Sequence, residues 1–209
     1  MNKLIIKSLT FVSFLGFAVV ANADTLLNTF GTVTSPGFLN NVQYVVDSGQ
    51  YMGRSFVTSF GSYNLTEIDI ALEFNTSNSI INVNLCSDNA GAPGSVLESF
   101  AVTNSGTLSF GSRYVLTSLT HPFLAMGGTY YVTMTPGDAN SGGGWSFTND
   151  AHTATLNYSV NSGTTWNTTT NTDGAVTVQG ALVPEPASMV VLGLGGLALV
   201  RRRKAIKLT

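Results

Sequence analysis

Three closely spaced carboxylates come nearest to a catalytic set in this chain: Glu67, Asp69 and Glu73. A pair of carboxylates that flanks a sugar bond is the machinery of most glycoside hydrolases. The residues around them, however, alternate between apolar and polar as in a strand, which places all three carboxylates on one polar face. A face exposed to water is the usual outcome of this pattern. We therefore expect neither a hydrolase nor any other enzyme.

Other catalytic patterns are missing from the sequence. It contains no G-x-S-x-G elbow, no H-E-x-x-H and no pair of cysteines. The two histidines, His121 and His152, lie in separate segments and belong to no spaced ligand set. Cys86 is the single cysteine, so no internal disulfide can form. We expect Cys86 to be a small apolar strand residue, with a reactive or intermolecular thiol as the alternative.

Two loops carry oxygen ligands of the kind that calcium accepts, Asp88 with Asn89 and Asp138 with Asn140. Both sequences are also typical of Asx turns, and neither has the spacing of an EF-hand. We therefore expect no cofactor and no metal site. A structural calcium ion at Asp88 or Asp138 is the weaker alternative.

Two tryptophans are candidates for stacking on a sugar ring. Trp145 is followed by Phe147 at strand spacing, which favours a position in the core. Trp166 lies among threonines and asparagines, where a surface position is more natural. Trp166 is therefore the candidate glycan contact.

The net charge of −2 for the whole chain hides a strongly acidic middle part. Between Asp24 and Leu182 there are two basic residues, Arg54 and Arg113, and ten acidic ones, a net charge of −8. Nucleic-acid binding needs clustered cations to neutralise phosphates. We therefore exclude nucleic acid as a partner.

The segments that must position these residues alternate between apolar and polar side chains, with a period of two residues. Apolar Ile68, Ile70 and Leu72 alternate with the acidic residues, and glycine-, asparagine- and serine-rich turns separate many short runs of this kind. We expect an all-β domain over residues 24–182, an antiparallel β-sandwich of jelly-roll type. The main expected strands cover residues 30–33, 42–46, 52–59, 65–74, 81–86, 96–102, 114–119, 129–135, 145–148, 155–160, 164–168 and 175–180. The Thr/Asn-rich residues 161–173 could form a stalk, but Trp166 within them favours a hairpin.

The first 23 residues have the pattern of a secretory signal peptide. Lys3 and Lys7 precede an apolar helical stretch, Ser8–Val20, and Ala21 and Ala23 form an A-x-A cleavage site. The expected partners are the secretion machinery and signal peptidase, and the mature chain would begin at Asp24. An uncleaved N-terminal anchor is the alternative.

Residues 183–209 have the composition of a membrane sorting tail. Two prolines in Val183-Pro184-Glu185-Pro186 end the preceding strand, and Ala187–Val200 is an uncharged, mostly apolar run. We expect this run to enter the inner membrane as a transmembrane helix, although its 14 residues also fit a core helix or an interfacial segment. Four cations that stay on the cytoplasmic side follow it: Arg201, Arg202, Arg203 and Lys204.

This tail resembles the C-terminus of PEP-CTERM proteins. The order of Val183-Pro184-Glu185-Pro186, a short apolar helix and an arginine cluster is the motif of that family. The resemblance implies that an exosortase reads the tail, in bacteria that make extracellular polysaccharide. It further implies cleavage near Pro184–Pro186, after which the domain reaches the cell surface or the extracellular space.

The middle of the chain resembles the domain called choice-of-anchor R. The shared segments are Leu65–Phe74, Asn82–Asp88, Gly91–Phe100, Gly127–Tyr131 and Ser162–Trp166. Such domains are exported with interchangeable sorting tails, and no enzymatic activity follows from the resemblance. Two functions remain: a structural component of the surface or matrix, or a module that binds polysaccharide or a partner through Trp166.

Overall fold

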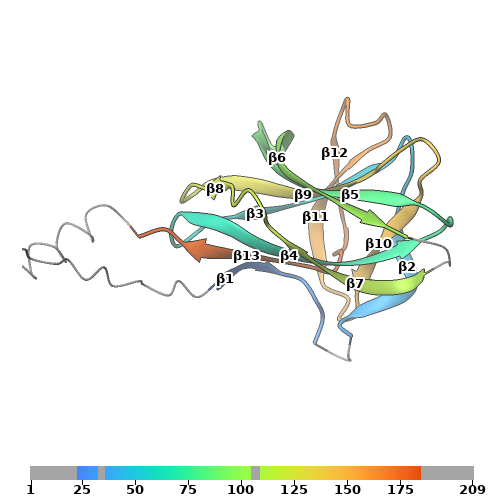
Figure 1. Cartoon of the computed structure of the whole chain (residues 1–209), viewed down its shortest axis with the longest axis horizontal. Coiled ribbons are helices and arrows are strands. Elements are labelled where there is room, and N and C mark those ends of the chain that lie inside the picture. Colours follow the sequence, from blue (N-terminus) through green and yellow to red (C-terminus); the bar gives the residue numbers. More distant parts are fainter. Residues whose placement is uncertain (1–22, 33–35, 105–108, 185–209) are drawn as a thin grey trace, which may run out of the picture.

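The computed structural model describes residues 23–32, 36–104 and 109–184, and throughout these ranges the fold is all-β (Figure 1). All strand pairings are antiparallel. The strands are β1 (Ala23–Asn28), β2 (Phe38–Val46), β3 (Tyr51–Val57), β4 (Tyr63–Phe74), β5 (Ile80–Asn89), β6 (Ala92–Thr103), β7 (Ser109–Thr117), β8 (Phe123–Leu124), β9 (Thr129–Pro136), β10 (Gly143–Thr148), β11 (Thr153–Ser159), β12 (Asn167–Thr172) and β13 (Val176–Leu182).

The strands form two sheets. The first has the order β1-β13-β4-β10-β2, with β7 and β8 also paired to β4. The second has the order β12-β11-β3-β9-β5-β6. The predicted all-β fold with two antiparallel sheets is confirmed.

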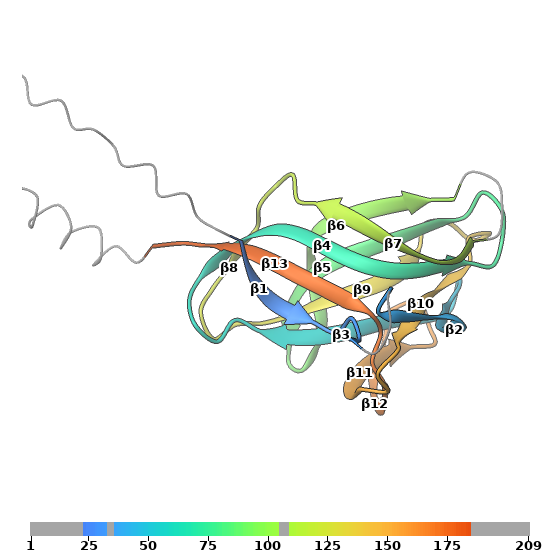
Figure 2. The same ribbon diagram turned by 90° about the horizontal axis from the view of Figure 1, so that it is seen from below.

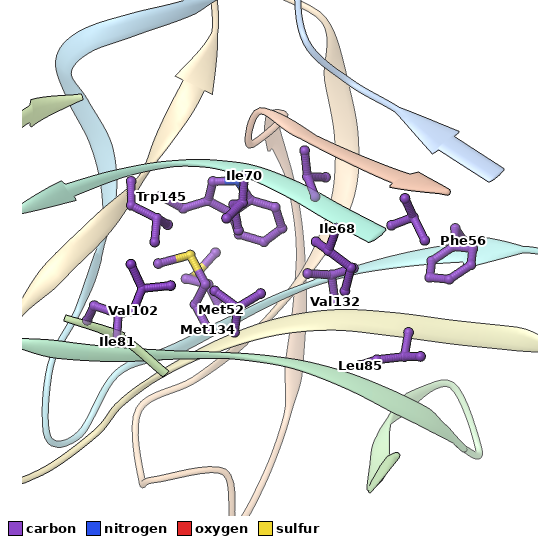
Figure 3. Packing of buried hydrophobic residues seen from close by; sticks show 14 of the residues in the cluster. Met52, Phe56, Ile68, Ile70, Ile81, Leu85, Val102, Val132, Met134 and Trp145 are labelled. Carbon is purple, nitrogen blue, oxygen red and sulfur yellow. The ribbon is translucent and has the colours of Figure 1, made fainter. Parts of the chain in front are cut away.

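The core lies between the sheets and uses the alternation seen in the sequence (Figure 3). Ile68 and Ile70 of β4 face Val132 and Met134 of β9, and all four side chains are fully buried. Trp145 on β10 is also fully buried, as its strand spacing predicted. Its indole Nε1 donates a hydrogen bond to the carbonyl oxygen of Ala175 at 3.1 Å, so the polar atom of this side chain is satisfied inside the core.

The prediction that the acidic face of β4 is solvated is wrong. Asp69 and Glu73 are buried, because β4 is the central strand and its outer face is covered by residues distant in sequence. Phe30, Phe38, Ala71 and Ala175 form a second, smaller apolar cluster outside the main core. Residues between β1 and β2 therefore help to cover the outer face of the first sheet, opposite the main core.

Two local predictions change in the structure, and a third is confirmed. The first strand is β1, at Ala23–Asn28, rather than a strand at 30–33; residues 29–32 lie outside the strands, and Val33 lies outside the described residues. The gap between the expected strands 81–86 and 96–102 is mostly strand in the structure, and only Ala90 and Gly91 separate β5 from β6 in a tight hairpin. Both have positive φ, 54° and 88°, as the favoured two-residue hairpin turns require. Residues 161–173 form a hairpin loop and β12, which confirms the hairpin over the stalk.

The first and last strands are neighbours, and this brings the two ends of the domain together. β1 pairs with β13, and the register sets Ala23 opposite Ala181. In both views the start of β1 and the end of β13 lie at the end of the sandwich that carries β8 (Figures 1 and 2). The segments before and after the domain therefore leave from the same place.

The expected signal helix and C-terminal transmembrane helix fall outside the described residues. So do Ala21, Glu185, Pro186 and the basic cluster Arg201–Lys204. Within the ranges that the structure covers, no helix is long and apolar enough to cross a membrane.

Candidate functional site

The sorting motif begins where the last strand ends. Leu182 is the final residue of β13 and pairs with Tyr63 of β4. The backbone N–H of Val183 donates a hydrogen bond to the carbonyl oxygen of Ser62 at 2.8 Å, and the next residue, Pro184, is exposed. No linker therefore separates the folded domain from the start of the motif.

The candidate signal cleavage site lies beside it. Ala23 is the first residue of β1, and Asp24 pairs with Gly180 of β13. A cut between Ala23 and Asp24 would remove only the first residue of the strand. The start of β1, where the first cut is expected, and the end of β13, from which the sorting motif continues, are thus neighbours at one end of the sandwich.

The three carboxylates of β4 do not form a catalytic pair, because each has a different partner. Asp69 forms an ion pair with Arg113 of β7, and the guanidinium of Arg113 also stacks 4.7 Å from the centre of the Phe30 ring. The backbone N–H of Asn41 donates to Glu73 Oε1 at 2.5 Å. Burial raises the pKa of Glu73, and this hydrogen bond opposes the shift.

The third carboxylate, Glu67, is half-buried and accepts a hydrogen bond from Gln179 Nε2 at 3.0 Å. Burial raises the pKa of Glu67, the neighbouring charge of Asp69 raises it further, and Arg113 lowers it. Each carboxylate on this face of β4 is thus bonded to a different residue of the domain. Nothing in the geometry aims two of them at a common substrate position.

The most deeply buried charge of the described residues was not predicted from the sequence. Asp173 is fully buried and accepts two hydrogen bonds from Arg54 Nε, at 3.1 Å to Oδ1 and 2.9 Å to Oδ2. His152 Nε2 lies 4.0 Å from Asp173 Oδ2. Burial raises the pKa of Asp173, and the charge and hydrogen bonds of Arg54 offset this only in part. The sequence signal was present, since the domain has only two cations and a buried carboxylate needs one of them.

A tyrosine completes this polar cluster. Tyr44 on β2 donates its hydroxyl to the carbonyl oxygen of Thr172 at 2.7 Å. Burial, and then the negative charge of Asp173, raise the pKa of Tyr44 to about 12. Tyr44 lies on β2 of the first sheet and Arg54 on β3 of the second, so the cluster connects the two sheets. Arg54 and Arg113 both form ion pairs with aspartates. The described residues therefore contain no arginine or lysine without a carboxylate partner that could bind an anionic ligand.

The candidate calcium ligands stabilise turns in the structure: Asp88 and Asn89 end β5, and Asp138 lies in the loop after β9. Asp88 Oδ1 accepts hydrogen bonds from the N–H of Gly91 and the hydroxyl of Tyr131, both at 3.0 Å. Asp138 Oδ1 accepts from the N–H of Asn140 at 2.9 Å and from Ser141 Oγ at 3.0 Å. Among the residues that the structure describes, no three His, Cys, Asp or Glu side chains are grouped to hold a metal ion.

Trp166 lies at the loop end of the β11–β12 hairpin and is half-buried. Its ring passes close to the backbone of Gly53 on β3: a Cβ at Gly53 would lie 3.7 Å from Trp166 Cζ3 and 3.4 Å from Pro93 Cγ. Trp166 therefore packs with the β5–β6 hairpin on the outer face of the second sheet and keeps part of its ring in solvent. A hollow of about 340 Å³ is lined by Tyr44, Tyr51, Met52, Tyr158 and Thr169, among others, and Trp166 is not one of its lining residues.

The remaining single residues have structural positions. His121 Nδ1 lies 3.0 Å from the carbonyl oxygen of Leu65. Cys86 is buried on β5, with Sγ 3.6 Å from Thr133 Oγ1, and burial raises the pKa of its thiol. Both features suit a packed strand residue better than a reactive thiol.

Comparison with known proteins identifies one part of the chain. No curated protein matches the sequence. The family model described as the PEP-CTERM protein-sorting motif matches residues 182–204. The match starts at Leu182, the last residue of β13. The chain therefore carries a PEP-CTERM sorting motif, joined directly to a two-sheet β domain.

Proposed function

We propose that this protein is an exported structural component of the cell surface or extracellular matrix, which an exosortase sorts and processes through its C-terminal tail. The proposal rests mainly on one observation: a PEP-CTERM sorting motif follows the last strand of a closed β domain without a linker. The signal-peptide pattern of the first 23 residues supplies the route out of the cytoplasm. The tail supplies the stop in the inner membrane and the recognition signal.

We assign no catalysis to the domain, which we place with the choice-of-anchor R domains as a jelly-roll sandwich. Its potential acids and bases are tied into the fold: Asp69 and Asp173 in ion pairs, Glu73 by the Asn41 N–H. A domain of this kind works through its shape and its acidic surface. In an extracellular polymer, that surface would contact polysaccharide.

Two variants separate the stop from the recognition signal. Replacing Arg201, Arg202, Arg203 and Lys204 with serine removes cations that each cost about 2.5–3.5 kcal/mol to bury in a membrane, so the chain should pass through unprocessed. Replacing Pro184, Glu185 and Pro186 with alanine leaves the stop but removes the motif, so the full-length chain should accumulate in the inner membrane. The proposal fails if both variants are cleaved and released like the wild type.

A second function, glycan binding, has one observation in its favour. Trp166 is half-buried and lies near Tyr51: a Cβ at Gly163 would be 3.2 Å from Tyr51 Cδ2 and 3.9 Å from Trp166 Cζ2. If Trp166 binds sugar, Trp166→Ala should abolish retention on the polysaccharide of the producing cell, and Phe60→Ala, in the loop between β3 and β4, should not. Equal retention of both variants would contradict glycan binding through Trp166 and support the structural role.

A further inference from the structure

The end of the sandwich from which the tail leaves is unusually apolar. Phe60 and Leu119 are the most exposed large hydrophobic side chains of the described residues, at 93% and 85%. Four more are exposed at the same end. We call the six together the apolar rim: Val57, Phe60, Leu119, Phe123, Met126 and Leu182.

Backbone contacts show that the rim is one surface built from four chain segments. β8 pairs with the start of β4, which places Phe123 opposite Asn64. The N–H of Met126 donates to Ser62 Oγ at 3.1 Å, and Ser62 also accepts from Val183. The side chain of Leu182 lies against Gly61. The loops before β4, before β8 and before β9 therefore surround the end of β13, and Figures 1 and 2 show these elements at one end of the molecule.

The rim is held rigidly. The carboxylate of buried Glu98 accepts hydrogen bonds from Ser118 Oγ at 2.6 Å, from the N–H of Leu119 at 2.7 Å and from the N–H of Thr120 at 3.0 Å. Leu119 therefore projects from a loop whose shape is fixed by a buried charge. It does not project from a loose strand end.

The backbone of the neighbouring loop is satisfied in the same way. The N–H of Ala125 donates to the Tyr130 hydroxyl at 2.7 Å, and the N–H of Gly127 to the carbonyl oxygen of Thr58 at 2.7 Å. The N–H of Gly128 donates to the carbonyl oxygen of Ala125 at 3.0 Å. Loops whose backbone donors are already paired can enter a poorly hydrated layer without the cost of breaking hydrogen bonds to water.

The short distance between the rim and the apolar run of the tail indicates what the rim contacts. Leu182 belongs to the rim, and the apolar run of the tail starts at Ala187. Even fully extended, these five residue steps span at most about 18 Å. If residues 187–200 enter the bilayer, the rim is held at the height of the lipid headgroups. A second copy of the chain would fit less well, because the tails of both copies would emerge in the middle of the contact.

We infer that the apolar rim is an interfacial docking surface, through which the domain rests on the lipid bilayer while its sorting motif awaits processing. Apolar side chains on such a surface insert at the boundary of headgroups and acyl chains, and binding grows with the apolar area buried. Docking would fix the orientation of the domain and hold Val183–Pro186 at the membrane surface, where a membrane enzyme can reach it. This inference rests on the proposed membrane insertion of the tail.

The test uses the full chain reconstituted in vesicles of phosphatidylethanolamine and phosphatidylglycerol. An environment-sensitive fluorophore is attached to a single introduced cysteine at position 60, 119, 160 or 194. Val160 is the matched control, since it is 61% exposed but lies outside the rim. Position 194 reports on the tail. Native Cys86 is buried and should stay unlabelled in the folded protein.

We expect the labels at 60 and 119 to shift to the blue and to lose emission to lipids with nitroxide-labelled acyl chains, as the label at 194 does. The label at 160 should stay unquenched. A quenched tail label combined with rim labels that behave like position 160 would overturn the docking surface and leave the proposed function intact. An unquenched label at 194 would instead count against the proposed function. A concentration-dependent shift of the rim labels without lipid would assign the rim to a second copy and also overturn the inference.

Discussion

Replacing Arg54 with methionine should destabilise the domain strongly and in a pH-dependent way. Arg54 is the ion-pair partner of Asp173, and the two side chains are 17% and 0% exposed. Methionine keeps the length and apolar stem of the side chain but leaves the carboxylate buried without its countercharge. Removing one partner of a buried pair costs about 3–5 kcal/mol. For a domain of this size, each kcal/mol lowers Tm by about 2–4 °C, so the expected loss is ~6–20 °C.

The pH dependence follows from Asp173. Burial already raises its pKa in the folded wild type. A carboxyl whose folded pKa is raised contributes stability below its unfolded pKa of about 3.9 and loses it as pH rises through the folded value. Removal of Arg54 raises the folded pKa further. The variant should therefore recover part of its deficit relative to the wild type as the pH falls from 7 toward 4.

The assay is thermal unfolding of the mature protein, followed by near-UV circular dichroism across this pH range. The double variant Arg54→Met with Asp173→Asn has no charge to bury and should regain much of the lost stability at pH 7. Arg113→Met is the matched control. Solvent reaches half of the Arg113 side chain, so its loss should be smaller. A deficit of under about 1 kcal/mol for Arg54→Met, or one that is constant from pH 7 to pH 4, would refute this account of the pair.

Three further predictions concern the packing of the sandwich. Gly174→Ala would bring a Cβ to 2.5 Å from the Trp145 ring, so urea unfolding should show a loss of about 1–3 kcal/mol from overpacking. Gly127→Ala meets no atom within 4 Å but has a φ of +74°, so its loss should be only about 1–2 kcal/mol of backbone strain; a larger loss than at Gly174 would contradict the packing of Trp145. Cys86 should react with a thiol reagent in urea and not in the folded protein, because its thiol is buried and its pKa is raised, and rapid labelling of the folded protein would contradict this position.

Local alternation was enough to predict the core strands but could not predict what covers their outer faces. Ile68 and Ile70 face the core as expected, because a half-buried strand repeats every two residues. Asp69 and Glu73 alternate with them, and their burial depends on Arg113 and Asn41, which lie 44 and 32 residues away. A local sequence pattern cannot indicate partners that are so distant in the chain.

The same limit applies to the ends and to the polar cluster. β1 shows no clear alternation, and only its pairing with β13 makes it a strand. Asp173 lies in a Thr/Asn-rich run that resembles a loop, and its burial follows from contact with Arg54, 119 residues away. The position of the sorting motif, by contrast, was evident from the sequence. Prolines, an apolar run and a cation cluster are contiguous in the chain and need no fold to be recognised.

Intact-mass analysis of the protein from the surface fraction is the most direct test of the central claim. If the tail is a sorting signal that an exosortase processes, the mature chain should begin at Asp24 and end near Pro184–Pro186, without the apolar run and the basic cluster. The variant with Pro184, Glu185 and Pro186 changed to alanine should retain its tail and stay in the inner membrane. A surface protein that still carries residues 187–209, or identical cleavage of the variant, would contradict the claim.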